Sequence, residues 1–208
     1  MMYITPLLLV VFFTGCGDYS NEFHAPWQEI AGRDERLPIY RARVPTEWER
    51  KDADASDPLL DTMQPLCEFI IRKGEQQILI TIHNFPTTTI KERVPVGAQI
   101  SRWKRQFSSL EELTESVHPQ SFGGFAGLVF YGEGKIKEIP QAMLAWAMQL
   151  PPEHFLEFLS NDKKSNAQMR ADYTIKAVGD PSLLSDCREE ITAFARSFEL
   201  IEEIPSPP

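Results

Sequence analysis

Two short apolar segments joined by a glycine turn limit the possible folds of this chain more than any other feature. Residues 66–71 and 77–82 are rich in isoleucine, each has the length of a strand, and Lys73-Gly74-Glu75 lies between them. Apolar runs bounded by turn residues are typical of strands, and so short a turn joins strands that pair antiparallel. The chain therefore predicts an antiparallel hairpin with a sheet built around it.

Further segments that predict strands are residues 39–44, 123–131, 141–150 and 173–178. The first and last alternate between apolar and polar side chains, which is the period of a strand. The second is rich in glycine. The third favours a strand, although its Ala-Met-Leu-Ala composition also suits a helix. Residues 49–65 and 86–95 contain prolines and predict loops.

The segments that predict helices are residues 97–107, a short piece at 109–112, and 181–198. In the first, Ile100, Trp103 and Phe107 fall on one side of a helix. The last carries an apolar stripe at helical spacing, and Asp180 before Pro181 is suited to be its N-cap.

Closely spaced strands with helices in the middle and at the end predict an α+β fold, an antiparallel β-sheet flanked by α-helices in an α/β/α sandwich. The predicted divisions are a signal peptide at 1–15, a lipidated N-terminus and flexible tether at 16–36, a single domain at 37–200 and a disordered tail at 201–208. The tether is polar and aperiodic, and the tail is acidic and rich in proline.

Three motifs within residues 38–200 resemble the PsbP-like family, whose fold is shared with the Mog-type Ran-binding proteins. They are Val44-Pro45-Thr46-Glu47-Trp48, the segment 100–106 with Ser101 in place of the family's Asn, and the segment 173–179 followed by a helix ending in Arg196-Ser197-Phe198. The resemblance implies an antiparallel sheet flanked by helices. It also implies an extrinsic, membrane-side binding or assembly protein, and it carries no catalytic residues to this chain.

The N-terminus resembles that of exported bacterial lipoproteins. Residues 4–15 are apolar over twelve positions, roughly 18 Å as a helix, which is too short for a bilayer core of about 30 Å. The run ends in Phe13-Thr14-Gly15-Cys16, which is similar to a lipobox, although Met1-Met2-Tyr3 lacks the usual cation and Phe13 replaces the commoner Leu. The resemblance implies removal of residues 1–15 as a signal peptide and acylation of Cys16. A secretory signal cut elsewhere and a buried N-terminal strand remain alternatives.

The surroundings of Cys16 and the overall charge bear on location and partners. In enteric lipoproteins an Asp directly after the cysteine favours retention in the inner membrane. Gly17 occupies that position here, so the resemblance implies the outer membrane in preference to the inner membrane. The net charge of −9 argues against a nucleic-acid partner, because binding a phosphate backbone requires cations. The expected partners are membrane lipid, through acylated Cys16, and another envelope protein.

The remaining candidate residues are cysteines, histidines and one basic cluster. Cys67 and Cys187 form either a disulfide or two buried thiols. The four histidines lack the spacing of a zinc site, so no metal or cofactor is expected. Arg102, Lys104 and Arg105 flank Trp103, and they either contact a partner or form the solvated side of a helix whose tryptophan is a core residue.

These observations favour a membrane-anchored envelope lipoprotein whose domain binds or helps assemble another envelope protein and is not an enzyme. A small-molecule or ion-binding lipoprotein is the first alternative. A hydrolase whose site the sequence does not reveal is the second.

Overall fold

The computed structural model of this chain describes residues 24–31, 38–52, 63–87, 89–161 and 171–202. The predicted signal peptide, Cys16 and residues 203–208 of the predicted tail lie outside the described residues. Within the described ranges, no helix has the length and apolar character needed to cross a membrane.

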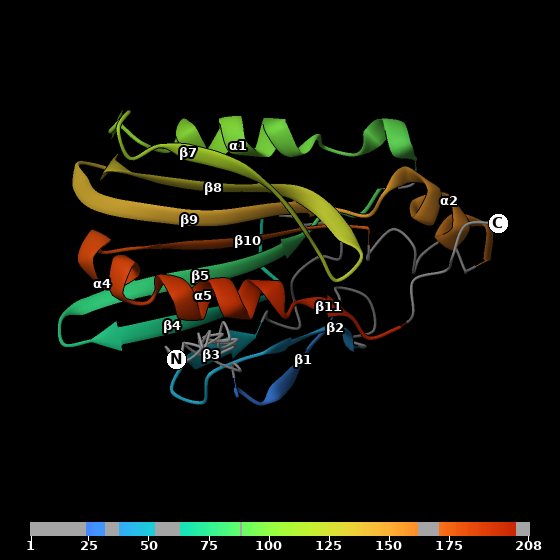
Figure 1. Cartoon of the computed structure of the whole chain (residues 1–208), viewed down its shortest axis with the longest axis horizontal. Helices are drawn as coiled ribbons and strands as arrows, with labels where there is room; N and C mark the ends of the chain where they lie inside the picture. Colours follow the sequence, from blue (N-terminus) through green and yellow to red (C-terminus); the bar gives the residue numbers. More distant parts are fainter. Residues whose placement is uncertain (1–23, 32–37, 53–62, 88, 162–170, 203–208) are drawn as a thin grey trace, which may run out of the picture.

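An antiparallel sheet of eight strands forms the centre of the fold (Figure 1). Its strands are β3 (Glu49–Asp52), β4 (Cys67–Lys73), β5 (Gln76–Asn84), β6 (Ser109–Leu110), β7 (Ser116–Phe122), β8 (Phe125–Ile136), β9 (Ile139–Gln149) and β10 (Asp172–Gly179). The order is β3-β4-β5-β10-β9-β8-β6, and β7 also pairs with β8. The predicted hairpin is β4 and β5, and Gly74 at its turn has a φ of 62°, a conformation that glycine adopts without steric cost.

A second, three-stranded sheet consists of β1 (Trp27–Ala31), β2 (Pro38–Arg43) and β11 (Glu199–Leu200). The sequence predicts a flexible tether as far as residue 36, but residues 27–31 of that segment form β1. Ile30 lies opposite Tyr40 of β2 and is fully buried. The sequence does not reveal this strand, because Ile30 is its only fully buried side chain and the other four are exposed or half-buried.

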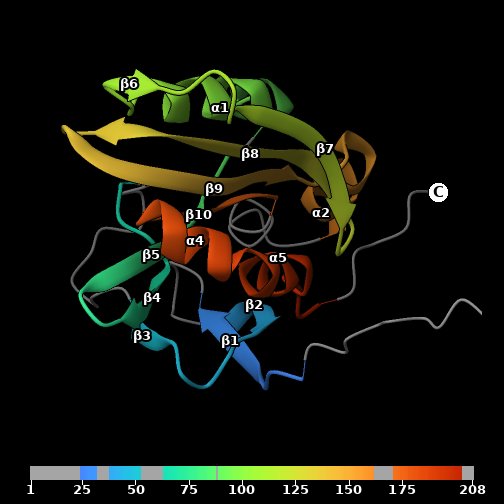
Figure 2. The same ribbon diagram turned by 60° about the vertical axis from the view of Figure 1, so that its left-hand side comes forward.

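Helices cover both faces of the large sheet, so the predicted α+β sandwich is confirmed. They are α1 (Val96–Lys104), α4 (Pro181–Asp186) and α5 (Arg188–Arg196), with η1 (Ile90–Glu92) and α2 (Pro152–Asn161) at one end. α1 packs on β8 and β9, and α4 packs on β5, β9 and β10. Figure 2 shows α1 on one side of these strands and α4 and α5 on the other, with β1 and β2 beyond α5.

Each face of the sheet has its own hydrophobic core. The larger core lies under α4 and α5, and the smaller one lies under α1. Trp103 is 4% exposed in the smaller core together with Ile100 and Phe107, as their spacing predicts. On β10, Ile175 belongs to the larger core and Val178 packs against the smaller one. The central strands are therefore buried on both sides.

Local sequence did not reveal every element. β6 replaces the helical piece expected at 109–112, because Ser109 and Leu110 pair with β8. β3 lies inside the expected loop 49–65, and the strand expected from residue 123 begins only at Phe125 after a two-glycine turn. β7 and α2 were not expected, and the helix expected at 181–198 divides at Cys187. Asp180 is the N-cap as predicted, and its carboxylate accepts the amide protons of residues 182 and 183.

Cys67 and Cys187 are free thiols in the structure, so the alternative of a disulfide between them is wrong. Cys67 begins β4, whereas Asp186, the neighbour of Cys187, pairs with Lys73 at the other end of that strand (3.1 Å). β4 ends beneath α4 in Figure 1. Six residue steps along a strand cover about 20 Å, whereas a disulfide joins Cα atoms less than about 7 Å apart.

The two thiols should differ in reactivity. Burial raises the pKa of Cys67 to about 12, and it raises the pKa of the more accessible Cys187 less. Because the thiolate is the reactive form, an alkylating agent should modify Cys187 of the folded protein well before Cys67. Mass spectrometry of the labelled peptides measures the order. After denaturation without reductant both should label fully, and protection of both until reductant is added would contradict the free-thiol structure.

Candidate functional site

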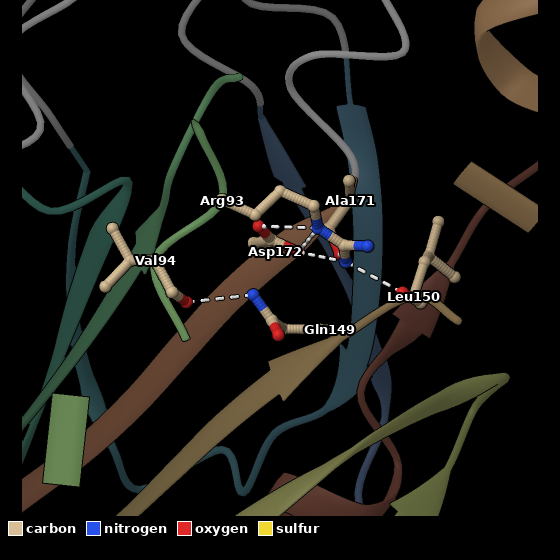
Figure 3. A network of polar contacts seen from close by, with 6 residues as sticks. All are labelled: Arg93, Val94, Gln149, Leu150, Ala171 and Asp172. Carbon is tan, nitrogen blue, oxygen red and sulfur yellow. Dashed lines mark hydrogen bonds and ion pairs between the residues drawn. The ribbon is translucent and has the colours of Figure 1, made fainter. Parts of the chain in front are cut away.

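A buried ion pair between Arg93 and Asp172 fixes the chain just before α1 (Figure 3). Arg93 Nε donates to both carboxylate oxygens of Asp172 at 3.0 and 3.1 Å, and Nη2 donates to the carbonyl of Leu150 at 2.7 Å. The side chain of Gln149 donates to the carbonyl of Val94 at 2.9 Å. These bonds join the segment that leads into α1 to the ends of β9 and β10.

This pair is enclosed rather than open to a ligand. The side chains of Arg93 and Asp172 are only 6% and 5% exposed, and the guanidinium carbon lies 4.8 Å from the centre of the buried Phe155 ring. Burial raises the pKa of Asp172, and the bonds and charge of Arg93 oppose that rise. We assign the pair a structural role, which is to hold α1 in place on the sheet.

The site with ligand-binding potential is a cleft between α1 and the sheet, with a volume of about 210 Å³. β5 and β10 provide one wall, α1 and the residues just after it provide another, and residues 63 and 85 complete the lining. Its lining residues are Met63, His83, Phe85, Gln99, Arg102, Trp103, Gln106, Thr174 and Lys176. We call this site the α1 cleft.

The α1 cleft holds two cations, Arg102 from α1 and Lys176 from β10. No Asp or Glu is among its lining residues in the described part of the chain. Lys176 is half-buried, and its Nζ lies 3.4 Å from the neutral Oε1 of Gln106. Burial and the nearby charge of Arg102 lower the pKa of Lys176. The local charge is therefore positive on a protein whose net charge is −9.

The predicted basic cluster divides in the structure. Arg102 lines the α1 cleft, whereas Lys104 donates to the carboxylate of Glu115. Arg105 is exposed and is not a lining residue of the cleft. Lys176 was not among the predicted site residues. Its signal in the sequence is a lysine between Ile175 and Ala177 in a predicted strand, because a cation at such a position needs a polar environment.

The histidines do not form one site. His83 lines the α1 cleft, and its Nε2 lies 3.4 Å from the carbonyl oxygen of Met63. His24 lines a separate hollow together with Glu47 and Glu190. Among the described residues, no three His, Cys, Asp or Glu side chains lie together in a group that could hold a metal ion.

Comparisons with known proteins show a shared fold. No protein-family model matches the chain, and no curated protein matches it. It is similar to LpqN of Mycobacterium tuberculosis, described as involved in cell envelope biogenesis, with a TM-score of 0.51 and 10% identity over 85% of this chain and 91% of LpqN. Cyanobacterial PsbP (CyanoP) from Synechocystis sp. PCC 6803 matches with a TM-score of 0.47 and 11% identity, over 90% of this chain and 98% of CyanoP.

The Arg93–Asp172 pair should matter greatly to stability. Replacing Arg93 with Met should lower the free energy of unfolding by about 3–5 kcal/mol, because it leaves a buried carboxylate without its cation. Urea denaturation of the purified protein measures the loss. Arg72→Gln is the matched control, since Arg72 pairs with Glu49 on the surface, where both side chains are more than half exposed. That change should cost less than about 1 kcal/mol, and equal losses for both variants would contradict the structural role.

Proposed function

We propose that this protein is a lipid-anchored lipoprotein of the bacterial cell envelope, and that its α+β domain binds or helps assemble another envelope protein without being an enzyme. Cys16 carries the lipid in this proposal, after removal of residues 1–15. The lipobox-like sequence ending at Cys16 supports the anchor. The fold shared with LpqN, itself described as involved in cell envelope biogenesis, supports an envelope role.

The α1 cleft is the observation that carries the binding function. Arg102, one of the predicted partner contacts, lies on its rim and is exposed, whereas Lys176 lies deeper. An exposed cation that forms no carboxylate pair in the described structure is available to a partner. The cleft offers guanidinium, ammonium and amide donors, which are suited to hold a negative group in place.

A small-molecule or ion-binding lipoprotein is the second candidate, and the presence of the α1 cleft supports it. Its volume of about 210 Å³ is below the roughly 300–1,000 Å³ of pockets for drug-sized ligands. The occupant would then be a compact anion rather than a large molecule. The two candidates differ in whether the anionic group belongs to a protein.

We place the protein at the outer membrane in preference to the inner membrane, on the basis of Gly17 after Cys16. Two or three acyl chains would make the attachment effectively permanent, since each buried CH₂ contributes about 0.8 kcal/mol. The domain would then meet its partner at the membrane surface.

Replacing Cys16 with Ser should abolish lipid attachment. In cells fed a clickable palmitate analogue, the wild-type protein should carry the label and fractionate with membranes, and the Cys16→Ser protein should not be labelled. Cys187→Ser is the control, because this thiol lies in the folded domain. Label that persists in Cys16→Ser, or that disappears in Cys187→Ser, would contradict lipidation at Cys16.

Partner binding should depend on Arg102. Cross-linking and co-purification from native membranes should recover a specific envelope protein with the wild type, and its yield should fall at least severalfold with Arg102→Gln. Arg105→Gln is the matched control, since Arg105 is exposed close to Arg102 but does not line the α1 cleft. Equal recovery with all three proteins would exclude this cleft as the contact site.

A further inference from the structure

We propose that the α1 cleft is an oxyanion-binding site in which Lys176 and Arg102 together hold one phosphate or carboxylate group. This inference rests on the proposed function, because it names the chemical group that the envelope partner or ligand presents to the domain. It goes beyond the predicted basic cluster, in which Lys176 had no part.

Lys176 lies on β10, and no carboxylate pairs with it in the described structure. Its neighbour across β5 is Thr81, and the residue beyond that on β4 is Glu68. Glu68 is therefore the carboxylate in register with Lys176, about 10 Å away across two strand spacings. It forms an ion pair with Lys51 at 3.7 Å. Its charge is thus already balanced, and it does not neutralise Lys176.

Two positive charges, on Lys176 and Arg102, line the same cleft. Arg102 reaches toward the cleft from α1, where its Nη2 lies 3.9 Å from the sulfur of Met63. Burial disfavours the protonated form of Lys176, and the charge of Arg102 adds to that effect. Among the described residues no carboxylate lines the cleft between the two cations, so they repel one another. An oxyanion bound between them would offset that repulsion, and it would stabilise the protonated form of Lys176 against the effect of burial.

Neutral hydrogen-bond donors line the cleft together with the two cations. Gln99 and Thr174 also line the cleft, and each is only 5% exposed. A side-chain amide and a hydroxyl can each donate to an oxygen of an anion. A volume of about 210 Å³ is several times the roughly 30 Å³ share of a water molecule in the liquid. That space accommodates one tetrahedral or planar oxyanion with a few waters.

Proton binding should be coupled to anion binding. The titratable groups at the cleft are Lys176 on β10, Arg102 on α1 and His83 on β5, with the paired Glu68 two strands away. Lys176 is charged below its lowered pKa and neutral above it. The affinity for an oxyanion should therefore fall as the pH rises through that pKa, and binding near it should take up a proton.

The test is calorimetric titration of the full-length protein in detergent micelles with inorganic phosphate and, separately, with acetate, at constant ionic strength set by chloride. We expect saturable binding at one site. Lys176→Met and Arg102→Gln should each weaken it about tenfold or more, since a charge-assisted hydrogen bond contributes that much. Arg105→Gln should change the affinity by less than about twofold. No saturable binding, or equal weakening by all three changes, would overturn the proposal.

Thermal melting without anion separates binding effects from folding defects. Because each cation opposes the other, Lys176→Met and Arg102→Gln should melt no lower than the wild type, and Lys176→Arg should retain anion binding. A large loss of stability in both charge-removing variants would indicate a structural role and would also overturn the proposal.

The comparison of phosphate with acetate identifies the source of the anion. If acetate lowers the yield of the cross-linked partner, the partner presents a carboxylate to the cleft. If only phosphate lowers that yield, the ligand carries a phosphate group. Suppose that Lys176→Met abolishes oxyanion binding but Arg102→Gln leaves partner recovery unchanged. That result would support this inference and contradict the proposed partner site. Partner recovery that requires Arg102 without any oxyanion binding would support the partner site and contradict this inference.

Discussion

The ion pair between Arg93 and Asp172 is the constraint from which the functional surface follows. Two charges removed from water must be matched closely, and here the guanidinium satisfies the carboxylate and a main-chain carbonyl at the same time. The pair lies where the chain enters α1, and it ties that entry to the ends of β9 and β10. The smaller core beneath Trp103 then holds the helix on the sheet. Together they hold α1 on the sheet, where it forms one wall of the α1 cleft.

Two environments of cationic side chains contrast in this structure, a buried ion pair and an open cleft. Arg93 is buried and matched by a carboxylate, which is the arrangement of a structural charge. Lys176 and Arg102 lie in a cleft whose described lining has no carboxylate, although the chain contains 30 acidic residues. Leaving two cations close together is unfavourable for folding alone. A site in which two cations repel one another is suited to bind an anionic group that offsets the repulsion. This is the basis of the proposed function.

Much of the fold could be predicted because strand and helix periods are local properties of a sequence. The β4–β5 hairpin, β10, the N-cap at Asp180 and the burial of Trp103 all follow from side chains within a few positions of one another. β1 and β6 could not be predicted in this way. β1 has one fully buried side chain, and β6 has two residues, so each depends on a partner strand far away in the chain. The same limit applies to the site, where Arg102 was predicted as a contact residue and Lys176, from a distant strand, was not.

The sequence by itself determined the α+β class and the segments from which the sheet is built, because alternating burial is written into neighbouring residues. It also predicts the anchor at Cys16, through a motif of four adjacent residues. Only the tertiary structure decided which charges are paired. Lys104 pairs with Glu115, whereas Arg102 lines the same cleft as Lys176. The tertiary structure also separates Cys67 from Cys187 by the length of β4. These outcomes depend on strand register and helix docking, which bring distant residues together and have no local signature.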